Sequence, residues 1–201
     1  MSGRTSPLYL ASASPRRREL LEQIGVAHRL LAVTVDEALH PGERPELYVL
    51  RLALAKARAG RVRMPATESA WVLGADTSVV VDGEILGKPR DQAEGIAMLE
   101  KLSGVIHHVY TGVALVGKDR EGTRLSVSAV SFRSMSREEC EEYWRSGEPV
   151  DKAGGYAVQG RAAMFISRLE GSYSGVMGLP LFETAELLRE VGLGGLVGSR
   201  D

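Results

Sequence analysis

Short apolar runs alternate with helical patterns along most of this chain, and that alternation limits the folds open to it. An apolar run at 8–11 leads into a helical pattern at 15–24, and the order repeats at 28–35 and 45–59. Such alternation predicts an α/β protein, in which helices cover a sheet. We expect Gly60 to end the second helix, because glycine readily adopts the left-handed conformation that closes helices.

The second half of the chain adds hairpins, so we predict a mixed, twisted sheet flanked by helices rather than a purely parallel one. Apolar runs at 71–75 and 78–81 lead to Asp82-Gly83, a pair typical of a hairpin turn. Helices are predicted at Asp91 and Ser136, where a capping residue is followed three positions on by glutamate. The remaining predictions are strands at 108–117, 124–133 and 164–169 and a last helix from Pro180.

The length and net charge of the chain exclude several classes of function. We expect the 201 residues to form one domain, with a middle lobe at 91–145 and a frayed tail at 194–201. The formal net charge of −1 argues against a nucleic-acid binder, which is normally strongly basic. Cys140 is the only cysteine, so no internal disulfide is possible, and no apolar run reaches membrane-spanning length. We therefore expect a cytoplasmic protein with neither membrane nor nucleic-acid partners.

Arg16, Arg17 and Arg18 lie in the first turn of the helix predicted to begin at Pro15. Cations at this end oppose the helix dipole and cost about 0.3–1 kcal/mol each, a penalty that a bound polyanion would outweigh. The same turn offers backbone N–H groups to phosphate. We expect Arg16 and Arg17 to bind phosphate, whereas Arg18 matches Glu22 four positions on.

Asp76 and Thr77 stand between two strongly apolar runs, and two interpretations remain open. Residues 74–77 are either a simple bend, with Asp76 bonded to its own backbone, or the end of a strand that presents a carboxylate in a crevice. In the second case Asp76 would bind Mg²⁺ or activate water.

Asp36 and Glu37 follow another apolar run. Such a pair usually faces solvent, but beside an anion site it becomes a stronger candidate for binding Mg²⁺. Two lysines are further candidates. Lys56 lies on a predicted helix, where a surface role is the default for a lysine. Lys88 lies in the extended Gly87-Lys-Pro89 loop, which makes it the stronger candidate of the two.

The glycine-rich segment 151–160 contains Gln159, whose amide has both a donor and an acceptor. Such an amide suits the edge of a nucleobase. The spacing alone is equally compatible with a tight turn between strands.

Several short motifs occur in one order, and together they resemble those of the Maf family of nucleoside triphosphate pyrophosphatases over about residues 8–193. The motifs are Ser12-Ala-Ser-Pro-Arg-Arg17, Val35-Asp-Glu37, Ala55-Lys-Ala57, Gly74-Ala-Asp-Thr77, Gly87-Lys-Pro89, Tyr110-Thr-Gly112, Asp151-Lys-Ala-Gly154 and Gly178-Leu-Pro180. Ala13 and Ser78 depart from the residues usual in the family, glycine and valine.

The resemblance implies an elongated, two-lobed single domain similar to inosine triphosphate pyrophosphatases, with a cleft between the lobes and often a homodimer. It implies hydrolysis between the α and β phosphates with a divalent cation, Mg²⁺ or Mn²⁺. Asp76 resembles the proton acceptor, and Arg16, Thr77 and Gln159 resemble the specificity positions. The Tyr156–Gly160 segment is similar to that of the branch acting on dTTP and UTP.

These implications combine with the residue patterns into one site prediction. The phosphates are expected to be held by Arg16, Arg17, Lys56 and Lys88, and Ser12 completes this anion site. The metal is expected to be placed by Glu37 and Asp76. The enzyme would hydrolyse dTTP and UTP and remove non-standard nucleotides. Two alternatives stand: a 7-methyl-GTP pyrophosphatase, against which Gln159 argues, and a non-catalytic nucleotide sensor linked to septum formation.

Overall fold

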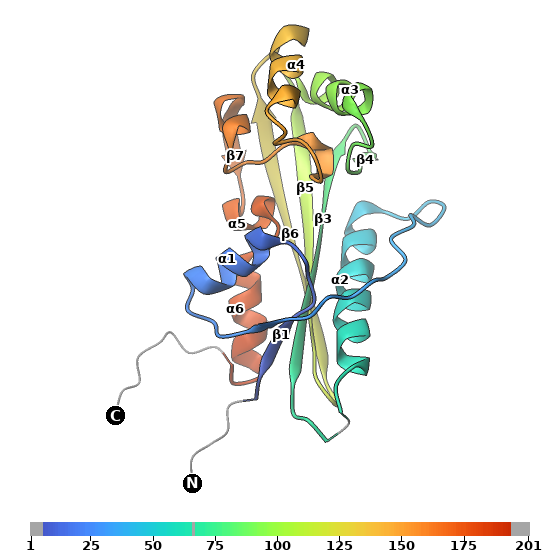
Figure 1. The fold of residues 1–201 in the computed structure, drawn as a ribbon, viewed down its shortest axis with the longest axis vertical. Helices are drawn as coiled ribbons and strands as arrows, with labels where there is room; N and C mark the ends of the chain where they lie inside the picture. Colours follow the sequence, from blue (N-terminus) through green and yellow to red (C-terminus); the bar gives the residue numbers. More distant parts are fainter. Residues whose placement is uncertain (1–5, 66, 194–201) are drawn as a thin grey trace. The chain divides into compact units, whose positions relative to one another are not determined.

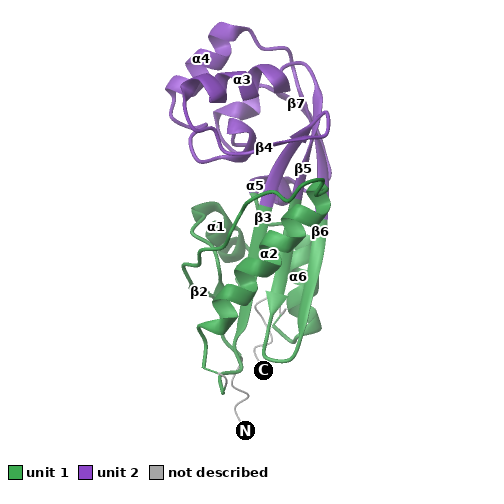
Figure 2. Ribbon diagram, turned by 90° about the vertical axis from the view of Figure 1, so that its right-hand side faces the viewer, with its two compact units in different colours: residues 1–76, 111–125, 178–201 green, residues 77–110, 126–177 purple. Residues whose placement is uncertain are grey.

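The computed structural model describes residues 6–65 and 67–193, so the predicted tail at 194–201 lies outside the described residues. The chain divides into two compact units (Figure 2). Unit 1 comprises Met1–Asp76, Thr111–Leu125 and Gly178–Asp201, and unit 2 comprises Thr77–Tyr110 and Ser126–Met177. The predicted middle lobe at 91–145 falls in unit 2 except for residues 111–125, which belong to unit 1.

The elements alternate much as the apolar pattern predicts (Figure 1). In chain order they are β1 (Leu8–Leu10), α1 (Pro15–Gln23), β2 (Arg29–Leu30), α2 (Pro45–Val62), β3 (Trp71–Val81), β4 (Glu84–Leu86), α3 (Gln92–Leu102), β5 (Ile106–Val116), β6 (Glu121–Phe132), α4 (Arg137–Arg145), the 3₁₀ turns η1 (Ala153–Gly155) and η2 (Arg161–Met164), β7 (Ile166–Glu170), α5 (Tyr173–Met177) and α6 (Leu181–Glu190). Among the described residues, none of the helices is long and apolar enough to cross a lipid bilayer.

The sheet is mixed, which confirms the prediction. Its strand order is β2-β1-β3-β5-β6-β7, and β4 pairs with β3 outside this path. β1 runs parallel to both β2 and β3, whereas the β3–β4 and β6–β7 pairs are antiparallel. Helices flank the strands, as the fold prediction requires (Figure 1).

The prediction of a break at 74–77 is wrong, because β3 runs without interruption from Trp71 to Val81. Gly74 is needed for close packing rather than for a bend. A Cβ atom built there would lie 2.3 Å from the Ala53 carbonyl oxygen and 2.8 Å from the Ala57 nitrogen. Asp76 is therefore held within a strand against which α2 packs closely, and not at a strand end.

Two boundaries also differ from the predicted ones. α2 continues past Gly60 to Val62, since Gly60 serves as a contact: a Cβ there would lie 2.7 Å from Val72 Cγ1. The strand predicted at 28–35 shrinks to Arg29–Leu30. Its neighbour β1 has only three residues, so there is little edge for a longer strand to pair with.

Short turn and helix-cap motifs predicted the structure more reliably than the boundaries above. Asp82 and Gly83 adopt φ values of 50° and 79° in the turn between β3 and β4, as expected for a two-residue hairpin loop. The Asp91 side chain accepts a hydrogen bond from the Glu94 nitrogen, and Ser136 forms a complete capping box with Glu139. Helix α5, in a stretch of glycine and serine, was not predicted.

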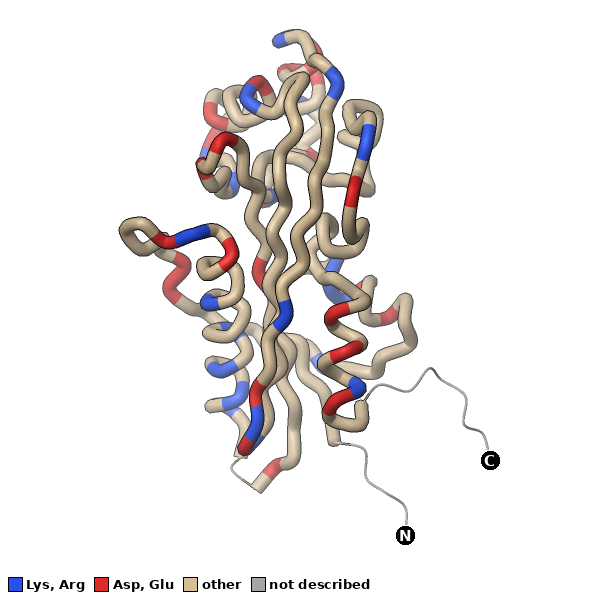
Figure 3. The backbone as a smooth tube through the Cα atoms, turned by 180° about the vertical axis from the view of Figure 1, so that it is seen from behind, with Lys and Arg blue, Asp and Glu red and all other residues tan. Residues whose placement is uncertain are grey.

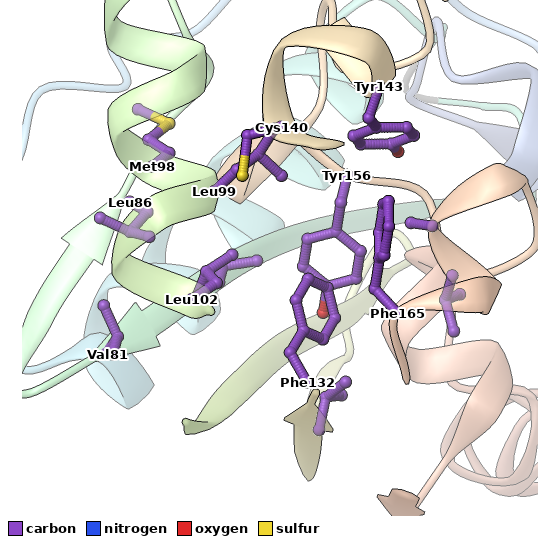
Figure 4. Close-up of a cluster of buried hydrophobic side chains, with 14 of the residues drawn as sticks. Val81, Leu86, Met98, Leu99, Leu102, Phe132, Cys140, Tyr143, Tyr156 and Phe165 are labelled. Atoms are coloured by element: carbon purple, nitrogen blue, oxygen red, sulfur yellow. The ribbon is translucent and has the colours of Figure 1, made fainter. Parts of the chain in front are cut away.

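Each unit has its own core. In unit 1, α2 packs through small residues, with Ala53 and Ala57 against Ala114 and Val116. The core of unit 2 is rich in aromatic side chains (Figure 4). It contains Val79, Val81, Leu86, Ile96, Met98, Leu99, Leu102, Val109, Val130, Phe132, Cys140, Tyr143, Tyr156, Val158, Ala162 and Phe165.

Candidate active site

A buried ion pair between α2 and β3 forms the centre of the candidate site in unit 1. Lys56 Nζ lies 2.7 Å from Asp76 Oδ1, and the two side chains are only 13% and 12% exposed. The close approach at Gly74 brings the helix within reach of the strand, so that a lysine side chain spans the gap. A surface role for Lys56, the default from sequence, is wrong.

Glu37 joins this pair from the loop that follows β2. Its Oε1 atom lies 2.6 Å from Lys56 Nζ, which thus bridges two carboxylates. The loop backbone is shaped by Asp36, whose Oδ1 accepts a hydrogen bond from the Ala38 nitrogen. The Tyr48 hydroxyl of α2 donates to the Glu37 carbonyl at 2.8 Å, which fixes the loop against the helix.

The environment of Asp76 favours its neutral form more than water does. Burial raises the pKa of Asp76, and Glu37 acts in the same direction, while Lys56 and Arg17 oppose the increase. The net direction is upward. A carboxylate whose pKa moves towards neutrality is better matched to accepting a proton from water.

Arg17 and Ser12 lie beside these charges. Arg17 Nε donates to the Gly178 carbonyl at 2.7 Å, and Nη1 donates to Ser12 Oγ at 3.3 Å. Burial lowers the pKa of Arg17, while the carboxylates of Asp76 and Glu37 raise it. The guanidinium is thus held in a fixed orientation close to the carboxylate cluster.

The start of α1 is close to the prediction. Ser14 is the N-cap, but its side chain makes no capping hydrogen bond, and Ser12 Oγ instead accepts from the Ser14 nitrogen at 3.2 Å. Arg16 is half-buried, and burial lowers its pKa against the opposing effect of Glu19. Arg18 is exposed and lies 3.6 Å from Glu22, which confirms the predicted pair.

Three predicted site residues belong to unit 2. Thr77 follows Asp76 directly on β3 and is half-buried. Lys88 is exposed in the loop after β4, and Gln159 is exposed between η1 and η2. The structure therefore brings together Ser12, Arg17, Glu37, Lys56 and Asp76 in unit 1, while Thr77, Lys88 and Gln159 are placed only within unit 2.

Basic residues line α2 (Figure 3), but most of them serve structure. Arg51 binds Glu43 through Nε and Nη2 at 2.6 Å each and also donates to the Ala38 carbonyl. Arg58 pairs with Glu121 at 2.6 Å. Lys56 differs from these in meeting two carboxylates at once.

Tyr48 and Arg51 are site-supporting residues that the sequence analysis missed. Both hold the loop containing Glu37, and the Arg51 guanidinium lies 5.5 Å from the centre of the Tyr48 ring. Their spacing of three residues on a helix places them on one face, which was the available signal. Nothing in the sequence indicated which loop that face would meet.

The residues at the centre fit a divalent cation that substrate would help to hold. Among the described residues, no group of three or more His, Cys, Asp or Glu side chains forms a metal site by itself. Asp76 and Glu37 would offer two hard oxygen ligands, and the position between them already holds a positive charge, the Lys56 ammonium. Mg²⁺ is commonly bound by one or two carboxylates together with substrate phosphates.

A separate hollow of about 650 Å³ lies at the C-terminal end of α2 and the β5–β6 turn, and it includes none of the predicted site residues. Arg58, Arg61, Lys118 and Arg120 line it together with Asp119 and Glu121. Its charges are therefore partly compensated.

Known proteins share extensive sequence similarity with this chain. The model of the family described as "Maf-like protein" matches residues 7–191. A protein of Alkalilimnicola ehrlichii named dTTP/UTP pyrophosphatase is 61% identical over 186 residues, covering 91% of this chain and 92% of the relative. A protein of Aromatoleum aromaticum with the same name is 52% identical and covers 92% of this chain and 95% of the relative.

Among solved structures, the Staphylococcus aureus Ham1 protein matches 80% of this chain and 91% of its own, with 13% identity and a TM-score of 0.48. The family match covers nearly all described residues, including every residue of the candidate site. The chain belongs to the Maf-like protein family.

Proposed function

We propose that this protein is a nucleoside triphosphate pyrophosphatase that hydrolyses dTTP and UTP to the monophosphate and pyrophosphate. The observation that carries the proposal is Lys56 bridging Glu37 and Asp76 next to a fixed Arg17. The names of relatives 52–61% identical to this chain support the choice of substrate.

Asp76 is the proposed proton acceptor. It orients a water molecule and takes up its proton as the water oxygen attacks the α-phosphorus and the bond to the oxygen leading to the β-phosphorus breaks, so that pyrophosphate leaves. The carboxylate must be ionised to act, so activity should fall as pH drops through its raised pKa. A bound Mg²⁺ or Mn²⁺ would neutralise phosphate charge, held by Asp76 and Glu37.

The cationic residues bind the phosphates in this proposal. Arg17 presents a guanidinium oriented by Ser12 and the Gly178 carbonyl, a charged donor of the kind that binds phosphate. Arg16, Lys56 and Lys88 supply further positive charge, and Arg16 also influences which nucleotide is accepted. Thr77 and Gln159 contribute to specificity, with the Gln159 amide reading the base.

A nucleotide panel with resolved products tests the proposal. We expect monophosphate and pyrophosphate from dTTP and UTP in the presence of Mg²⁺ or Mn²⁺, at rates above those with 7-methyl-GTP. Orthophosphate release would mean cleavage at the γ position and would reject the reaction. Preference for 7-methyl-GTP would favour the alternative substrate, and nucleotide binding without turnover would favour the sensor linked to septum formation.

Asp76→Asn should lower kcat by about 10²–10⁴, because removing a general base typically costs that much. The matched control is Asp82→Asn, since Asp82 is exposed in the β3–β4 turn and asparagine tolerates its positive φ of 50°. The control should retain activity within about twofold. If Asp76→Asn stayed within about threefold, well under 1 kcal/mol of barrier, the assignment of the base would be wrong.

A cytoplasmic location, removal of non-standard nucleotides and a homodimeric state belong to the same proposal. Sedimentation of the purified chain tests the dimer, and non-standard nucleotides can be added to the panel. Equal turnover of modified and ordinary pyrimidine nucleotides would argue against a specific role in removing non-standard nucleotides.

A further inference from the structure

Gln159 lies on a tightly held turn in unit 2. Tyr156, Ala157 and Val158 before it are buried at 5%, 5% and 6% exposure, whereas Gln159 itself is exposed. Two residues further on, η2 begins at Arg161. The chain thus presents one amide side chain directly after three buried residues.

A single tyrosine–glutamate pair binds this turn on both sides of Gln159. The Tyr143 hydroxyl accepts a hydrogen bond from the Ala157 nitrogen at 3.2 Å and donates one to Glu148 Oε1 at 2.7 Å. The Glu148 carboxylate in turn accepts from two backbone nitrogens beyond the glutamine, those of Arg161 at 2.9 Å and Ala162 at 3.2 Å. One side-chain pair therefore anchors the backbone at Ala157, Arg161 and Ala162.

Packing around Glu148 leaves it little freedom. A Cβ atom built on Gly160 would lie 2.3 Å from Glu148 Oε2, so the carboxylate lies directly against the backbone of the turn. Burial raises the pKa of Glu148, but the hydrogen bonds from Arg161, Tyr143 and Ala162 outweigh it and lower the pKa overall. The carboxylate is accordingly ionised near neutral pH and accepts strong hydrogen bonds.

The other support of the turn is aromatic. The Tyr143 ring packs edge-on against Phe165, with 5.5 Å between centroids, within the core shown in Figure 4. The Tyr156 hydroxyl lies 2.8 Å from His107 Nε2, and its ring is 5.0 Å from that of Phe132. Packed aromatic side chains thus lie beside the turn that presents Gln159.

We propose that Tyr143 and Glu148 are positioning residues for base discrimination: they hold the Gln159 amide where it distinguishes uracil and thymine from cytosine. This inference rests on the proposed function. Uracil and thymine present the O4 acceptor and a protonated N3, whereas cytosine presents the N4 amino donor and an unprotonated N3. A fixed backbone limits the positions that the amide can reach, and small displacements from a matching position weaken hydrogen bonds steeply.

The test compares kcat/KM for UTP with that for CTP in Tyr143→Phe and Glu148→Gln. Tyr143→Phe removes the hydroxyl and little else, while Glu148→Gln places a donor amide near backbone N–H groups. We expect the UTP/CTP ratio to fall at least about fivefold in each variant, mainly through KM for UTP, with kcat for UTP changed by less than about threefold. Amide hydrogen exchange at Ala157, Arg161 and Ala162 should become faster.

A double-mutant cycle separates positioning from general destabilisation. In the Gln159→Ala background, neither substitution should lower the ratio further, because the group they position is absent. The matched control is Ser103→Ala, since Ser103 Oγ also bridges two backbone groups in unit 2, accepting from the Met135 nitrogen at 2.7 Å and donating to its carbonyl at 3.1 Å. This control should lose stability without changing the ratio.

Different experimental results would overturn the positioning role, base reading by Gln159 and the pyrophosphatase reaction. Faster amide exchange with an unchanged UTP/CTP ratio would overturn the positioning role, as would an equal fall of the ratio in Ser103→Ala. An unchanged ratio in Gln159→Ala would remove base reading by this residue, and the inference with it, while leaving the pyrophosphatase reaction intact. Absence of pyrophosphate release by the wild-type chain would reject the proposed function itself.

Discussion

His107 allows a quantitative prediction about the stability of unit 2, because its side chain is fully buried at 0% exposure. Its Nε2 atom lies 2.8 Å from the Tyr156 hydroxyl, and Nδ1 is buried with no hydrogen-bond partner among the described residues. Burial, with a smaller contribution from His108, lowers the pKa of His107 from 6.5 to about 4. Protonation of the ring is therefore unfavourable in the folded chain.

The folded and unfolded states take up this proton at different pH. As pH falls below 6.5 the unfolded chain is protonated first, and the folded chain follows only near pH 4. The stabilisation is consequently complete above the unfolded pKa and is lost as pH falls towards the folded pKa. These two values correspond to a loss of about 2 kcal/mol between pH 8 and pH 5, approaching about 3 kcal/mol below pH 4.

Urea unfolding at pH 8 and pH 5 measures this loss in the wild type, His107→Gln and His108→Gln. Glutamine cannot titrate but still forms a hydrogen bond, so the free energy of unfolding of His107→Gln should fall by about 2 kcal/mol less than that of the wild type across this interval. His108→Gln is the control, because His108 is adjacent but exposed, and it should resemble the wild type. An identical pH dependence in His107→Gln and the wild type would refute the reasoning.

Three further predictions concern unit 1. Lys56→Gln should raise the pKa of Asp76, moving the acid limb of the pH–rate profile to higher pH, and should cost about 3–5 kcal/mol in urea unfolding because a buried carboxylate loses its partner. Arg17→Lys loses the forked geometry that holds its guanidinium, so KM for UTP in steady-state assays should rise about tenfold, with kcat changed less. Gly74→Ala forces a Cβ to within 2.3 Å of the Ala53 carbonyl oxygen and should lower the free energy of unfolding by about 1–3 kcal/mol or more; a change below about 0.5 kcal/mol would show that α2 can shift freely.

Sequence patterns predicted the features that neighbouring residues determine. The Asp82-Gly83 turn and the Ser136 capping box each depend on contacts within a few positions, so the local sequence was sufficient. Glycine was harder to interpret. Gly60 and Gly74 are required by the close approach of another element, and a missing Cβ gives the same signal whether the cause is a turn or a contact.

The centre of the site illustrates the same limit for charged residues. Asp76 and Glu37 were identified as carboxylates of interest, but the bridge through Lys56 depends on how α2 packs on β3. Lys88 was ranked above Lys56 because its loop was distinctive, yet Lys56 is the lysine that the structure places between carboxylates. Likewise, no sequence spacing connects Tyr143 and Glu148 with the turn that presents Gln159.

The bridge formed by Lys56 has a consequence for how the site is filled. Two carboxylates, Asp76 and Glu37, face two cations, Lys56 and Arg17, so the charges of this group cancel before any ligand arrives. Lys56 is in effect an internal counter-ion. In the proposed reaction, a metal ion arriving alone would have to compete with a tethered ammonium, whereas a metal–nucleotide complex would offer that ammonium a phosphate in exchange and would therefore be favoured over separate binding.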